Sequence, residues 1–120
     1  MTNPIKIGLS GLAAASARLE VSANNIANVN NTKSAGFADT VEGLTSRQAY
    51  QPKQVRLTPM TNGGVSAQIT NAPIGAEVSL AEEIVQLKVA QHTYNANAAV
   101  IKTALEVEDT MLETFSKPKN

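Results

Sequence analysis

The sequence predicts a mainly α-helical chain, with two long terminal helices that pair as an antiparallel-type coiled coil around a small insertion containing a β-hairpin. Apolar residues recur in 4-3 alternation at both ends of the chain, which is the spacing of a heptad seam. In the middle, the pattern changes to a period of two on either side of an Asn-Gly pair. The 120 residues therefore divide into an N-terminal helix (1–35), a short β-rich insertion (36–77) and a C-terminal helix (78–120).

The N-terminal helix is expected to begin at Asn3 and Pro4, because asparagine is a favoured N-cap and proline fits the first helical position. Gly8 and Gly11 lie in a run of small residues that permits close approach of another helix, although each glycine costs about 1 kcal/mol of helix propensity. The heptad seam of this helix consists of Ile5, Leu9, Leu12, Ser16, Leu19, Ala23, Ile26 and Asn30.

Repeated asparagine marks the end of this helix, at positions 24, 25, 28, 30 and 31. Asparagine is unfavourable inside a helix because its amide competes for backbone groups. Two interpretations are open. The segment is either a frayed helix end or a specific polar joint, in which Ile26 and Val29 keep an apolar contact while the amides form hydrogen bonds.

The insertion carries two short runs of alternating apolar residues, at positions 53–60 and 65–70. Asn62-Gly63 lies between them, and this dipeptide is a strong hairpin signal. Pro52 and Pro59 restrict the runs to short or edge strands, because proline cannot donate to a strand ladder. Phe37 and Tyr50 are the large rings available to anchor the insertion.

The C-terminal helix is the longest element that the sequence predicts. Ser79 and Glu82 have the spacing of a capping box, and no glycine or proline follows until Pro118, so the helix should run for about 35 residues or about 50 Å. Its seam consists of Leu80, Ile84, Leu87, Tyr94, Ala98, Ile101, Leu105, Leu112 and Phe115. Further apolar residues on other faces, including Val85, Val89, Ala96, Val100 and Val107, predict that neighbouring subunits cover this helix.

The composition argues against an enzyme or a nucleic-acid-binding protein. The formal net charge is zero, the aromatic content is 3% and cysteine is absent, so neither a basic patch nor a thiolate metal site is expected. His92 is the sole histidine, and the acidic pair Glu82 and Glu83 lies in a first helical turn, where acids favour the helix dipole. We therefore expect no catalytic, metal or cofactor site, no nucleic acid and no small-molecule substrate. Residues 6–17 resemble a secretory signal only weakly, because glycines interrupt the apolar stretch and the helical pattern continues through it.

Two segments resemble a known family. Residues 21–30, with the sequence Val-Ser-Ala-Asn-Asn-Ile-Ala-Asn-Val-Asn, and the following Gly36-Phe37 are similar to the N-terminal signature of the bacterial flagellar rod, hook and hook-associated proteins. Residues 78–85, 90–91 and 94–103 are similar to the signature that closes the same proteins. The short interval between the two segments is most like that of a small proximal rod protein.

The resemblance implies a structural subunit of the flagellar basal-body rod, located in the periplasm, that assembles helically through its terminal helices and forms part of the drive shaft and export channel. It also implies as partners copies of the chain itself, other rod, hook and basal-body proteins, and the export apparatus. Proteins of this family pass through the export apparatus without a cleaved signal peptide. The alternative is a soluble coiled-coil adaptor or flagellar export chaperone. The residues expected at contacts between subunits are Leu9, Leu12, Leu19, Asn24, Asn25, Ile26, Asn28, Leu87, Tyr94, Ile101, Leu105 and Leu112.

Overall fold

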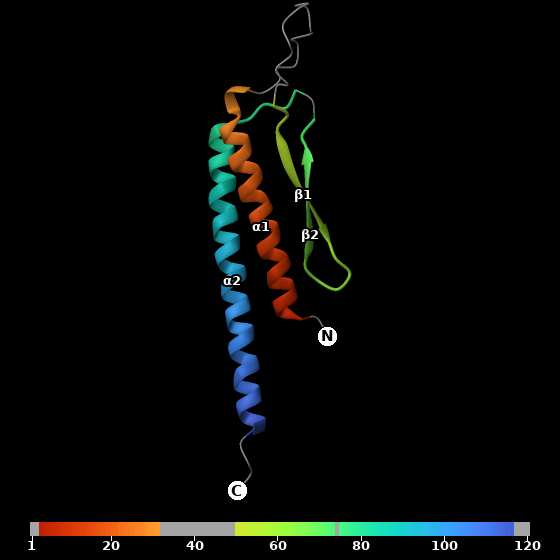
Figure 1. Cartoon of the computed structure of the whole chain (residues 1–120), viewed down its shortest axis with the longest axis vertical. Helices are drawn as coiled ribbons and strands as arrows, with labels where there is room; N and C mark the ends of the chain where they lie inside the picture. The colour runs from red at the N-terminus through yellow and green to blue at the C-terminus, as the bar shows by residue number, and fades with distance from the viewer. Residues whose placement is uncertain (1–2, 32–49, 74, 117–120) are drawn as a thin grey trace, which may run out of the picture.

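The computed structural model describes residues 3–31, 50–73 and 75–116 and confirms the mainly helical fold. The elements in chain order are α1 (Pro4–Ala27), the short 3-10 helix η1 (Val29–Asn31), β1 (Lys53–Pro59), β2 (Val65–Asn71) and α2 (Leu80–Ser116). Helices α1 and α2 run antiparallel side by side, and the hairpin lies against α1 on the side away from α2 (Figure 1). The predictions that rest on Gly36, Phe37 and Pro118, and the boundary at residues 35–36, lie outside the described residues.

Both helices begin as the sequence predicts. The side-chain oxygen of Asn3 accepts hydrogen bonds from the backbone N–H groups of Ile5 at 2.9 Å and Lys6 at 3.3 Å, and Pro4 occupies the first helical position. In α2 the Ser79 hydroxyl accepts a bond from the Glu82 backbone N–H at 3.4 Å, which is the serine half of the predicted capping box. Helix α2 then continues for 37 residues, in agreement with the expected length.

The contact between α1 and α2 depends on small residues. A Cβ atom on Gly8 would lie 2.6 Å from Cγ1 of Ile101, and a Cβ on Gly11 would collide with the side chain of Asn97. Ala15 of α1 and Ala90 of α2 are buried, with exposed fractions of 1% and 0%. The helices therefore approach closely enough that side chains of α2 fill the space above the two glycines. The antiparallel pair is observed, whereas coiled-coil packing of the heptad seams stays a prediction.

The hairpin forms where the sequence predicts it. Strands β1 and β2 pair antiparallel, in a register that sets Lys53 opposite Asn71 and Pro59 opposite Val65. The turn closes with a hydrogen bond of 3.0 Å from the Gly63 N–H to the Met60 carbonyl oxygen. Gly63 and Gly64 have φ values of 82° and 87°, a conformation that is unstrained only for glycine.

Alternate residues of the hairpin are half-buried where it packs on α1. These residues are Lys53, Val55, Leu57, Val65 and Ala67, and the other residues of the two strands are exposed. The tip of the hairpin is fixed by the Ser10 hydroxyl, which accepts a hydrogen bond of 3.1 Å from the Val65 N–H and donates one of 2.7 Å to the Ile7 carbonyl oxygen. No described helix is both long and apolar enough to cross a membrane.

Candidate assembly interface

The asparagine-rich end of α1 contains one side chain that joins three elements. Asn25 is 3% exposed, and its amide nitrogen donates to the Lys53 carbonyl oxygen at 2.9 Å and to the Glu83 carboxylate at 2.6 Å. Its amide oxygen accepts from the Lys53 N–H and from the Tyr50 hydroxyl, both at 2.9 Å. Two donated and two accepted bonds use the full capacity of an asparagine amide. Asn25 therefore pairs with the peptide groups of Lys53 as a neighbouring strand would, and connects α1 to both β1 and α2.

The environment of Tyr50 follows from this arrangement. Burial raises the pKa of the Tyr50 hydroxyl above its ordinary value, and the nearby negative charge of Glu83 raises this pKa further. Both effects disfavour a tyrosinate beside the carboxylate. The tyrosine is thus held in its protonated form, in which its hydroxyl can donate to Asn25.

The other two predicted asparagines behave differently. Asn24 donates to the Glu20 carbonyl oxygen at 3.0 Å, and Asn28 donates to the Asn24 carbonyl oxygen at 2.9 Å, so both side chains return to their own helix. Asn25 thus matches the polar-joint interpretation within the subunit, while its neighbours satisfy local backbone groups. Participation of the three asparagines in contacts between subunits stays a prediction.

Helix α2 carries apolar side chains on both sides of its contact with α1. Ala90, Asn97 and Ile101 form the line of α2 that contacts α1. Because successive residues of a helix are turned by about 100°, a separate stripe of apolar side chains lies on each side of this line. The stripe on one side, which we name the leucine flank, consists of Leu80, Ile84, Leu87, Tyr94, Leu105 and Leu112. The stripe on the other side, which we name the valine flank, consists of Val85, Val89, Ala96, Val100, Val107 and Met111. All members of both flanks are exposed except Leu87, which is half-buried.

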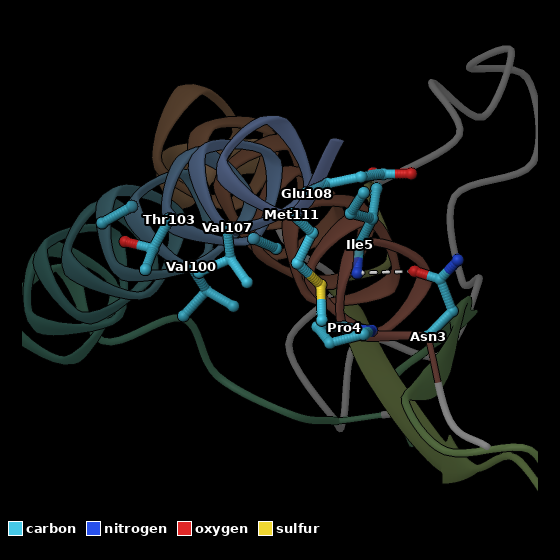
Figure 2. A pocket seen from close by; sticks show the side chains of 10 residues that line it. Asn3, Pro4, Ile5, Val100, Thr103, Val107, Glu108 and Met111 are labelled. Carbon is cyan, nitrogen blue, oxygen red and sulfur yellow. Dashed lines mark hydrogen bonds between the residues drawn. The ribbon is translucent and has the colours of Figure 1, made fainter. Parts of the chain in front are cut away.

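A groove adjoins the C-terminal end of the valine flank. It lies between the first turn of α1 and the second half of α2, and has a volume of about 800 Å³. Pro4 and Ile5 line it from α1, while Val100, Val107 and Met111 line it from α2, with the Met111 side chain reaching towards Pro4 (Figure 2). Its lining is mostly apolar, so it offers space for side chains and not for a charged ligand.

A polar strip separates the two flanks on the side of α2 opposite α1. It consists of Lys88, His92, Asn95, Lys102, Glu106 and Glu113, all of which are exposed. Lys102 and Glu106 form an ion pair at 3.8 Å, and both side chains are mostly exposed, so the pair contributes little to stability. This strip is a solvated surface, in contrast to the apolar flanks beside it.

The nine predicted interface residues other than the asparagines fall into two groups. Leu12, Leu19, Ile26, Leu87 and Ile101 are half-buried between the elements of the subunit. Leu9, Tyr94, Leu105 and Leu112 are exposed, with exposed fractions of 41% to 64%. No pattern in the sequence marked Tyr50 and Glu83 as partners of Asn25. The spacing of Gly8 and Gly11 on one helical face was a signal for a close contact, but it did not indicate which residues of α2 fill the space above them.

An uncovered apolar surface of this extent is typical of a structural protein that completes its packing against other chains. Residues 5–35 match the family described as "Flagella basal body rod protein", and residues 75–114 match the family described as "Flagellar basal body rod FlgEFG protein C-terminal". The chain belongs to this family of flagellar rod and hook proteins and is a structural component of the flagellar basal body. No match was found among curated proteins.

Proposed function

We propose that the chain is a subunit of the periplasmic rod, assembles helically with copies of itself and with other rod and hook proteins, and forms part of the drive shaft and export channel. In this proposal the segments 1–35 and 78–120 form the assembling core and the segment 36–77 is an insertion. The chain is delivered by the flagellar export apparatus without a cleaved signal peptide. The exposure of apolar residues along α2, together with Leu9 of α1, carries this proposal.

The two heptad seams share one side of the helix pair. In each helix the heptad seam is turned by about 60° around the helix axis from the line along which α1 and α2 meet. The turn has the same sense in both helices, and in α2 it is towards the leucine flank. Because the helices are antiparallel, these turns bring the two seams to the same side of the pair. Leu12, Leu19 and Leu87 are half-buried along the middle of this surface, and Leu9 and Leu105 are exposed along its edges. A helix from a neighbouring subunit can lie in such a surface.

The energetics favour assembly with several neighbours over a stable dimer. Covering a half-exposed leucine contributes about 1 kcal/mol, whereas association costs on the order of 4–15 kcal/mol in lost freedom. A contact through a few such residues is therefore weak by itself. Several contacts formed together in a rod overcome the same cost, so we expect a monomer before assembly.

The experiment compares two substitutions on α2 in the bacterium that encodes the chain. Leu105→Asp places a charge on the leucine flank, and Asn95→Asp places the same charge on the polar strip. We expect wild type and Asn95→Asp to restore motility to a deletion strain and to be found in isolated basal bodies. Leu105→Asp should be absent from basal bodies although its purified form has unchanged helicity by circular dichroism.

Two results would contradict the proposal. One is normal incorporation of Leu105→Asp. The other is a wild-type chain that is absent from basal bodies and forms a discrete dimer with another flagellar protein, which is the behaviour of an adaptor or chaperone.

A further inference from the structure

We infer that the leucine flank and the valine flank of α2 are the two halves of one contact, in which the leucine flank of one copy packs against the valine flank of the next copy. This inference rests on the proposed function and specifies its partner as a second copy of the chain. It also specifies the contact as heterologous, so that different surfaces of the two copies meet.

The positions of the flanks allow each α2 to have two such neighbours. The flanks lie on opposite sides of the contact with α1, and the polar strip separates them on the remaining side. A copy bound to one flank therefore leaves the other flank free. Repetition of one heterologous contact generates a ring or an open helix of parallel copies.

The sizes of the side chains favour contact between different flanks. The leucine flank presents long or aromatic side chains such as Tyr94, Leu105 and Leu112, whereas the valine flank presents short ones such as Val89, Ala96 and Val100. Well-packed surfaces set large residues opposite small ones so that the side chains interdigitate. Pairing each flank with itself would set large against large and small against small, and would leave both contacts poorly packed.

The groove adds space on the valine side for large side chains. Its volume of about 800 Å³ lies beside Val100, Val107 and Met111, at the level where α1 begins. Beyond the first turn of α1, the leucine flank of α2 continues to Leu112, and Phe115 follows three residues later; their exposed fractions are 64% and 85%. A copy that brings these side chains into the groove of its neighbour would cover both surfaces together.

The low charge of both flanks agrees with a contact between them. The named members of both flanks are uncharged, and Lys88, Lys102, Glu106 and Glu113 lie on the polar strip. Asp109, between Leu105 and Leu112, is a charged residue at the C-terminal end of the leucine side. Between Val85 and Leu105 neither flank therefore has to desolvate a charge when it is covered.

The area of the contact explains why two neighbours are needed. The valine flank from Val85 to Met111 is about 40 Å long at 1.5 Å per residue, and a helix flank is about 10 Å wide. One contact thus buries about 400 Å² on each copy, or about 800 Å² in total, which is below the roughly 1,200 Å² of a stable standard interface. A copy with neighbours on both flanks takes part in twice this area.

Cross-linking in isolated basal bodies tests the inference. The chain has no cysteine, so single cysteines can be introduced without background. The variants are Leu105→Cys alone, Val100→Cys alone, and double variants that combine Leu105→Cys in turn with a cysteine at Val85, Val89, Val100 or Val107. Asn95→Cys on the polar strip is the control. Each tagged variant is the sole copy in its strain, and the basal bodies are treated with a short bismaleimide.

We expect a ladder of cross-linked copies from at least one double variant, and no cross-linked pair of copies from any single variant or from Asn95→Cys. Self-dimers from Leu105→Cys alone or Val100→Cys alone would overturn the inference, because they require a flank to meet itself. The absence of a ladder from every double variant present in basal bodies would also overturn it. A parallel series with Tyr94→Cys in place of Leu105→Cys applies the same criteria if a variant is not incorporated.

The content of the basal bodies before cross-linking separates this inference from the proposed function. If the wild-type tagged chain is present but no ladder forms, the chain is a rod subunit whose copies meet in another way. If the wild-type tagged chain is absent, the proposed function itself fails.

Discussion

Replacement of Asn25 by alanine should release the hairpin from the helices while leaving α1 and α2 intact. The substitution removes four hydrogen bonds, two to the backbone of Lys53 and one each to Tyr50 and Glu83. A net hydrogen bond contributes about 1 kcal/mol, and buried groups left without a partner cost more. We therefore expect a loss of about 3–4 kcal/mol in the free energy that holds β1 against α1.

Hydrogen exchange followed residue by residue measures this loss directly. Since 1.4 kcal/mol corresponds to a factor of ten, the amides of the hairpin should lose at least about a hundredfold in protection, beginning with the Lys53 N–H. Amides in the middle of α1 and α2 should change much less. Circular dichroism at the same temperature should show that the helices remain.

Asn24→Ala is the matched control, because Asn24 is the adjacent asparagine and its amide bonds only to the Glu20 carbonyl oxygen of its own helix. Alanine has the higher helix propensity, so this variant should be neutral or slightly more stable. If Asn25→Ala and Asn24→Ala changed hairpin protection by the same factor, the assignment of Asn25 as the joint between the elements would be refuted.

Three further predictions concern the helix pair and Tyr50. Gly11→Ala should lower the free energy of unfolding by about 1–2 kcal/mol, measured with urea, because the new Cβ displaces the Asn97 side chain. Stability should fall as the pH rises above about 10 in wild type and not in Tyr50→Phe, because the raised pKa of Tyr50 means that folding favours its protonated form, which is lost at high pH. Ile101→Asp should separate α1 from α2 and abolish rod assembly, because a carboxylate facing Gly8 loses several kcal/mol of hydration.

Each of these three predictions has its own control and contrary result. Ser16→Ala, on the exposed side of α1, should leave the free energy of unfolding unchanged. If Gly11→Ala also left it unchanged, this result would argue against the close approach of the helices at Gly11. A Tyr50→Phe variant that lost stability with pH as steeply as wild type would assign the dependence to other groups. Asn95→Asp, at an exposed position of the polar strip of α2, should be tolerated, and motility in the Ile101→Asp strain would show that Ile101 does not hold the helices together.

Much of the fold could be predicted because its signals are local. Asn3 and Pro4 specify the start of α1, Ser79 specifies the start of α2, and the Asn62-Gly63 pair specifies the turn of the hairpin. Each of these signals acts through backbone groups within a few residues along the chain. The length of α2 followed in the same way, from the absence of glycine and proline between residue 79 and residue 116.

The partners of the asparagines could not be predicted from the same information. Asn24, Asn25 and Asn28 are chemically equivalent in the sequence, but only Asn25 points towards the hairpin and α2. Its partners Tyr50, Lys53 and Glu83 are between 25 and 58 residues away along the chain. No local pattern connects positions so far apart, because their proximity depends on how the elements pack.

The sequence by itself determined the two helices, the residues at which they begin and the hairpin, and it predicted apolar stripes on more than one face of the C-terminal helix. The tertiary structure decided which stripe is used inside the subunit. Gly8 and Gly11 leave room for Asn97 and Ile101, so the helices meet along a line of small residues beside the heptad seams. The physical reason is that periodicity identifies apolar faces without stating which face meets which, whereas close packing selects the pair of faces whose shapes fit.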